Sequence, residues 1–220
     1  MNKNIKFASA VVCIFGGLTA LPASAAVVSS ISGGIVHSMP AIDYFGGGPQ
    51  VFGPGITWSS TNLSNQGGSV FGYTGGYGFA GNGYWDGGLG PMAGLNDSTD
   101  AYGVTDTMTF AFSSPVSAVG GFINYVPGSA NPTVLAVYDS GMNLIESYST
   151  NVFISSNTND GLFVGFDIGV SNISYFTLTD NYVGITDLTT PVPEPETYAM
   201  LLAGLGLLGF MARRRKGATV

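Results

Sequence analysis

Residues 107–112 read Thr-Met-Thr-Phe-Ala-Phe, and this stretch indicates the fold of the domain around it. Apolar side chains alternate with polar or small ones, so Met108, Phe110 and Phe112 share one face of an extended chain. Alternation of this kind is typical of a strand with one buried face. We therefore expect a half-buried β-strand here, ended by a turn at Ser113-Ser114-Pro115.

Short apolar runs separated by Gly, Pro, Asn and Asp surround this stretch, and no long segment of the domain has helical periodicity. The further expected strands are 27–36, broken at its two glycines, 50–58, interrupted by Gly-Pro-Gly, 116–126, kinked at Gly120-Gly121, 133–138, 144–149, 162–168, 172–179 and 182–188. We expect an all-β domain, a two-layer antiparallel β-sandwich of about nine or ten strands.

Residues 67–94 are rich in glycine and also contain six aromatic side chains. Glycine favours loops and close backbone approach, whereas the aromatic rings need a surface to pack against. We expect long loops with short strand segments, held by their aromatic side chains.

The first 25 residues have the features of a secretory signal peptide. Lys3 and Lys6 precede an apolar run at 7–21, and Ala-Ser-Ala at 23–25 provides small residues for cleavage. We expect a signal helix that is removed between Ala25 and Ala26.

Three segments of different character follow residue 190. Pro191, Pro193 and Pro195 keep the backbone extended, because each ring fixes φ and removes a donor. Residues 198–212 carry no charge and predict an apolar helix, which ends at a basic cluster of Arg213, Arg214, Arg215 and Lys216.

This apolar helix is short for a membrane span. Its 15 residues would measure about 22 Å, whereas a bilayer core of about 30 Å needs nearer 20 residues. Snorkelling of the basic side chains reduces the mismatch, and the positive-inside rule places them in the cytoplasm as a membrane stop. The chain thus divides into a signal peptide (1–25), an exported β-sandwich domain (26–190) and a C-terminal segment (191–220).

Residues 192–196 read Val-Pro-Glu-Pro-Glu, and with the apolar helix and the Arg cluster they resemble the PEP-CTERM sorting signal of Gram-negative bacteria. Pro193, Glu194 and Pro195 match the motif that names the family. The resemblance implies export by the Sec machinery and recognition by exosortase, a membrane protease-transpeptidase, in bacteria that make exopolysaccharide. Residues 116–187 also resemble, more diffusely, the jelly-roll ectodomains that often precede this signal.

Charge is distributed unevenly along the chain. All six Lys and Arg lie in the two end segments, and residues 26–190 contain 11 Asp and Glu, so the domain has a net charge of about −11. Nucleic-acid binding is excluded because no cation is present to meet the phosphates. The single cysteine, Cys13, is in the signal peptide, so the domain has no disulfide.

The residues give no pattern for catalysis. His37 is the single histidine, no Gly-x-Ser-x-Gly sequence occurs, and zinc would lack ligands. The scattered Asp residues single out no pair for glycoside hydrolysis. We therefore expect a protein that is not an enzyme.

Calcium is the one cofactor that the sequence suggests. Asp97, Asp100 and Asp106 concentrate oxygen ligands in one segment, with a weaker second group at 157–160. The alternative is that these residues only form turns, in which case no cofactor is needed.

Exposed aromatic rings would provide a second kind of site. Trp58, Tyr84 and Trp85, with Tyr73 and Tyr77 near them, could stack on sugar rings. The alternative is that these rings form the core beneath the glycine-rich loops.

Two functions follow. The first is a non-enzymatic cell-envelope or extracellular-matrix protein. It would be anchored transiently in the inner membrane with its C-terminus in the cytoplasm, then located in the envelope, on the cell surface or outside the cell, with exopolysaccharide as a candidate partner. The second is a secreted carbohydrate-binding module, or less readily a carbohydrate-cleaving one. Exposed aromatic rings beside an open cleft would favour the second function.

Overall fold

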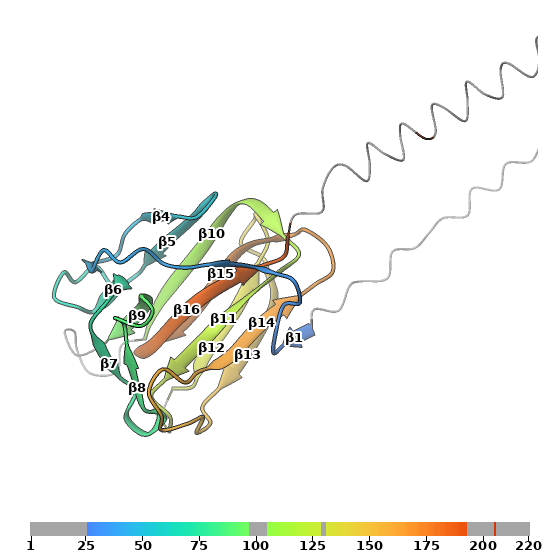
Figure 1. The fold of residues 1–220 in the computed structure, drawn as a ribbon. Coiled ribbons are helices and arrows are strands. Elements are labelled where there is room, and N and C mark those ends of the chain that lie inside the picture. Colours follow the sequence, from blue (N-terminus) through green and yellow to red (C-terminus); the bar gives the residue numbers. More distant parts are fainter. Residues whose placement is uncertain (1–25, 97–104, 129–130, 193–204, 206–220) are drawn as a thin grey trace, which may run out of the picture.

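The computed structural model describes residues 26–96, 105–128, 131–192 and Leu205. Within these ranges the protein is all-β, with antiparallel sheets in a sandwich-like arrangement, as expected (Figure 1). The signal helix and most of the apolar helix at 198–212 lie outside the described residues. Among the residues described, no helix is long and apolar enough to cross a membrane.

The larger sheet has eight strands, all paired antiparallel. Their order is β1 (Ala26–Val28), β14 (Leu162–Asp167), β11 (Ala118–Tyr125), β16 (Tyr182–Thr190), β9 (Met92–Asn96), β6 (Ser69–Tyr73) and β3 (Tyr44–Phe45), with β2 (Ile35–His37) paired to the end of β16.

The smaller sheet has six strands, also antiparallel. Their order is β13 (Leu144–Thr150), β12 (Thr133–Tyr138), β15 (Ile173–Asp180), β10 (Asp106–Val116), β5 (Ile56–Ser60) and β4 (Gln50–Phe52). A separate hairpin joins β7 (Gly76–Gly78) to β8 (Tyr84–Asp86) through a 3₁₀ turn, Ala80–Asn82.

The main core lies between the two sheets. Met108 and Phe110 of β10 are fully buried and Phe112 is partly buried, so the face predicted from residues 107–112 is confirmed. Aromatic contacts join the sheets: Phe166 of β14 packs edge-on against Phe176 of β15, with ring centroids 6.2 Å apart.

The β7–β8 hairpin covers part of the outer face of the larger sheet and is visible at the lower left of Figure 1. Gly94 of β9 and Gly184 of β16 are register partners that face outward. A Cβ on Gly184 would lie 2.9 Å from Phe79 Cζ and 3.1 Å from Trp85 Cζ3. The absence of side chains at this glycine pair therefore lets the rings of the hairpin pack directly on the sheet.

Three local expectations were wrong. The Ser113-Ser114-Pro115 stretch does not end the strand, because β10 continues through it to Val116 with an irregular register against β15. Residues 27–36 do not form one broken strand, since β1 pairs with β14 whereas β2 pairs with β16. The structure has sixteen strands within its described ranges rather than nine or ten. The glycine-rich segment supplies β6 to β9, residues 50–60 form the β4–β5 hairpin instead of one interrupted strand, and β3 and the division between β1 and β2 add two more.

Candidate functional site: the pocket beside the C-terminal tail

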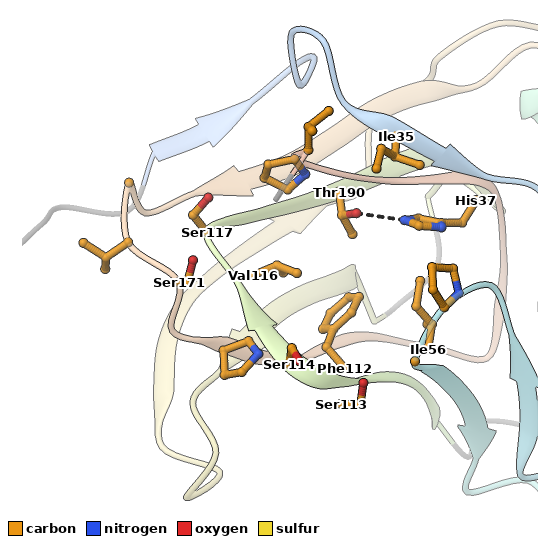
Figure 2. A pocket seen from close by; sticks show the side chains of 17 residues that line it. Ile35, His37, Ile56, Phe112, Ser113, Ser114, Val116, Ser117, Ser171 and Thr190 are labelled. Atoms are coloured by element: carbon orange, nitrogen blue, oxygen red, sulfur yellow. Dashed lines mark hydrogen bonds between the residues drawn. The ribbon is translucent and has the colours of Figure 1, made fainter. Parts of the chain in front are cut away.

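A cavity of about 770 Å³ lies at the end of the sandwich where β16 ends (Figure 2). We call it the tail-exit pocket. Its lining comes from β2, the turn before β5, residues 112–117, the loop at 169–171 and residues 190–192. It is therefore formed where the two sheets meet and where the chain leaves the domain.

One wall of the pocket depends on pairing between β2 and the end of β16. Thr189 is opposite Val36, and Thr190 is opposite Ile35. Thr189 and Thr190 are buried, and His37 Nε2 lies 2.8 Å from Thr190 Oγ1 within hydrogen-bonding distance. Backbone pairing and this side-chain contact together fix the last residue of β16.

Burial controls the charge of His37. The side chain is buried, and the loss of solvation lowers its pKa from the usual 6.5. At neutral pH the imidazole is therefore uncharged and forms one hydrogen bond with the Thr190 hydroxyl, in which the tautomer decides the donor. None of the described residues that line the pocket is a carboxylate that could orient the ring as a catalytic base.

The irregular end of β10 forms the opposite wall. Ser113 N donates to Gly55 O at 2.8 Å, which holds this segment against the turn before β5. Gly55 has φ of +75°, and a Cβ there would lie 2.1 Å from Ser113 Oγ, so a side chain would strain both segments. The residues expected to form a turn are thus a wall of the pocket.

The chemistry of the lining is neutral throughout. Figure 2 shows Phe112, Val116 and Ile56 pointing into the space beneath Thr190 and His37. Serine hydroxyls stand around this apolar floor, and none of the lining residues in the described ranges is Asp, Glu, Lys or Arg. The domain has a net charge of about −11, whereas the described residues that line the pocket are uncharged.

Both ends of the domain lie beside this pocket. Ala26, the first residue expected after signal cleavage, begins β1 and is the register partner of Asp167, two residues before the loop that lines the pocket. Pro191 and Val192 are themselves lining residues. Ala25, the motif Pro193-Glu194-Pro195 and the basic cluster at 213–216 lie outside the described residues.

The structure corrects the proposed sugar-stacking set. Trp58 is fully buried in the main core and stacks on Phe71 with centroids 5.1 Å apart. Trp85 is 4% exposed, packs against Phe79, and donates from Nε1 to Asp160 O at 2.7 Å. The alternative reading, in which these rings form the core, therefore applies to both tryptophans. Tyr84 is 46% exposed and is not brought together with them on the surface.

The structure describes one of the three residues that were predicted to bind calcium. Asp97 and Asp100 lie outside the described residues, whereas the Asp106 carboxylate accepts hydrogen bonds of 2.8 Å from Thr61 Oγ1 and Asn62 Nδ2. In the described ranges no three His, Cys, Asp or Glu side chains cluster as metal ligands would. Calcium at residues 97–106 stays a prediction.

At the second group, residues 157–160, the Asp160 carboxylate accepts from Ser155 Oγ and Asn157 Nδ2, which lowers its pKa. Asn159 bonds the backbone of Asp86 in both directions. These contacts close the loop over the β7–β8 hairpin, so the polar side chains here have a structural role.

The tail has a recognised counterpart among protein families. Residues 191–216 match the family model described as the PEP-CTERM protein-sorting motif, which confirms the resemblance drawn from the sequence. The motif implies export targeted by exosortase. The comparison with curated proteins finds no match.

Two solved structures from Streptococcus pneumoniae have partial similarity. The fucose binding module SpX-3 is 4% identical, with 47% of this chain and 73% of that chain covered and a TM-score of 0.32. A second fucose binding module is 10% identical, with 47% and 71% covered and a TM-score of 0.31. Similarity at this level supports no inference about the ligand of this chain.

Proposed function

We propose that this is an exported, non-enzymatic protein of the cell envelope or extracellular matrix, sorted and processed by exosortase through its C-terminal tail. The observation that carries the proposal is the PEP-CTERM motif at residues 191–216, which begins directly after the last strand of a folded domain. A folded domain that is followed directly by a sorting signal has the arrangement needed for delivery of that domain.

The steps of delivery follow from the order of segments. The signal peptide directs the chain out of the cytoplasm and is cut before Ala26, where β1 begins. The apolar helix at 198–212 then holds the chain in the inner membrane, with Arg213–Lys216 on the cytoplasmic side. Exosortase processing frees the domain from this anchor for the envelope, the cell surface or the exopolysaccharide.

The domain itself is proposed to act through its surface rather than by catalysis. In support, the part of the tail-exit pocket that the structure describes contains no carboxylate, and its histidine, His37, is hydrogen-bonded to Thr190. A jelly-roll class for the sandwich is part of the proposal, supported by the two antiparallel sheets. Carbohydrate binding, the alternative, has lost Trp58 and Trp85 as stacking residues and is not favoured by the described residues.

The proposal is tested by changing Pro193-Glu194-Pro195 to three alanines in the producing bacterium. We expect the wild type outside the inner membrane with a shortened C-terminus, and the variant retained in the inner membrane with Val220 present. Fractionation and mass analysis of the C-terminus measure both outcomes. An identical location and an intact Val220 in both strains would overturn the proposal.

A further inference from the structure

The spacing between the domain and its sorting motif is very short. Thr190 is held by its pairing with β2, and only Pro191 and Val192 separate it from Pro193. Extended backbone spans at most about 3.6 Å per residue, so the Cα atoms of Thr190 and Pro193 are within about 11 Å. An enzyme that holds the motif must therefore meet the end of the sandwich.

The surface that it meets is the tail-exit pocket. Pro191 and Val192 lie in its lining, so the chain passes along the pocket before it reaches the motif. Val170 and Val192 are 55% and 53% exposed, and Ile35 is 39% exposed. These three apolar side chains are exposed residues of the pocket lining, so an apolar partner would gain by covering them.

We propose that the tail-exit pocket is a second recognition surface for exosortase, which inserts an uncharged, apolar segment there while it holds the PEP motif. This inference rests on the proposed function. Among the lining residues that the structure describes none is Asp, Glu, Lys or Arg, and His37 is neutral, so a charged segment would lose its hydration without gaining an ion pair from any of them. An apolar segment has no such penalty, and the serine hydroxyls can bond its backbone.

With two linked recognition elements, the PEP motif and the tail-exit pocket, exosortase can recognise this protein specifically although the motif itself is short. Once the motif is bound, a linker of two residues holds the pocket at high effective concentration next to the enzyme. The pocket is too small to make a stable interface by itself, which would need about 800 Å² from each partner. Each contact is weak alone, and the fixed distance between them makes the pair specific.

The first test places a charge at the pocket rim of the full chain, in the producing bacterium. Val170→Glu is compared with Leu63→Glu, since both side chains are exposed and Leu63 lies away from the pocket, after β5. We expect Val170→Glu to slow C-terminal processing about tenfold, the effect of 1.4 kcal/mol, with Leu63→Glu near wild type. Equal thermal melting of both purified variants shows that folding is intact. Equal processing rates in both would overturn the inference.

The second test breaks the fixed distance. Twelve Gly and Ser residues inserted between Val192 and Pro193 leave both elements intact but separate them. We expect slower processing, because the effective concentration falls with linker length. Processing at or above the wild-type rate would overturn the inference, since it would show that the domain does not assist the enzyme.

The Pro193-Glu194-Pro195→Ala variant separates the two proposals. If it is processed normally, the proposed function fails. If it is not processed whereas Val170→Glu and the insertion are processed as wild type, the sorting function stands and the pocket inference alone is wrong.

Discussion

Replacement of Trp85 by alanine should destabilise the domain strongly. The ring is 4% exposed and packs against Phe79 with centroids 5.2 Å apart. Truncation of a buried tryptophan costs about 3–5 kcal/mol. The lost hydrogen bond to Asp160 O adds little, because Asn124 Nδ2 also donates to that oxygen at 3.2 Å.

We therefore expect a loss of about 4 kcal/mol in the free energy of unfolding for Trp85→Ala. For a domain of this size, 1 kcal/mol changes Tm by about 2–4 °C, so Tm should fall by about 10 °C. Tyr84→Ala is the matched control: it removes a neighbouring aromatic ring that is half exposed, and we expect about 1 kcal/mol or less.

Urea unfolding followed by far-UV circular dichroism gives both free energies. Trp85 is a core residue between the glycine-rich hairpin and the larger sheet. If Trp85→Ala kept the wild-type Tm and lost binding to a polysaccharide, that assignment would be wrong and the ring would be a sugar platform.

Two further predictions concern stability, and a third concerns the pKa of a carboxylate. Gly184→Ala should lower the free energy of unfolding in urea by about 1–3 kcal/mol, because its Cβ would press on the Phe79 ring. Gly90→Ala should be neutral, because the space around Gly90 is open. Equal effects of the two substitutions would contradict the packing of the Phe79 ring on Gly184. Folding lowers the pKa of His37, so the contribution of His37 to the free energy of unfolding should be complete above pH 6.5 and decrease as the pH falls below it. His37→Gln should remove this pH-dependent contribution. The same pH profile of stability in the wild type and in His37→Gln would contradict the prediction. The Asn143 side chain lowers the pKa of Asp139, so Asn143→Ala should raise that pKa towards 3.8 in an NMR titration, and no change would contradict the assignment.

Strands with strict alternation or a buried position were predictable from the sequence. Residues 107–112 form a strand with the expected buried face, and residues 133–138 form a strand as expected, which the Asp139–Asn143 segment joins to β13 as a hairpin. In these cases the side-chain pattern and the local turn chemistry favour the same structure.

The glycine-rich segment was harder to interpret, because its packing depends on residues distant in sequence. Gly94 and Gly184 are register partners on β9 and β16, and no local pattern shows that rings at 77–85 will cover them. The six aromatics did indicate packing against something, but not which face. The same lack of long-range information left open whether Trp58 and Trp85 are core or surface residues.

The tail-exit pocket was also missed. Ser113-Ser114-Pro115 has ordinary turn chemistry, and its continuation as strand depends on contact with Gly55 and β15. By contrast, the sorting motif was recognised from the sequence, because its three segments follow one another directly along the chain.

The central claim is that both ends of the chain are address segments that the cell removes or processes. The intact mass of the protein recovered outside the inner membrane tests it most directly. We predict a chain that begins at Ala26 and lacks the basic cluster at 213–216. An exported chain of the full 220 residues would contradict the account.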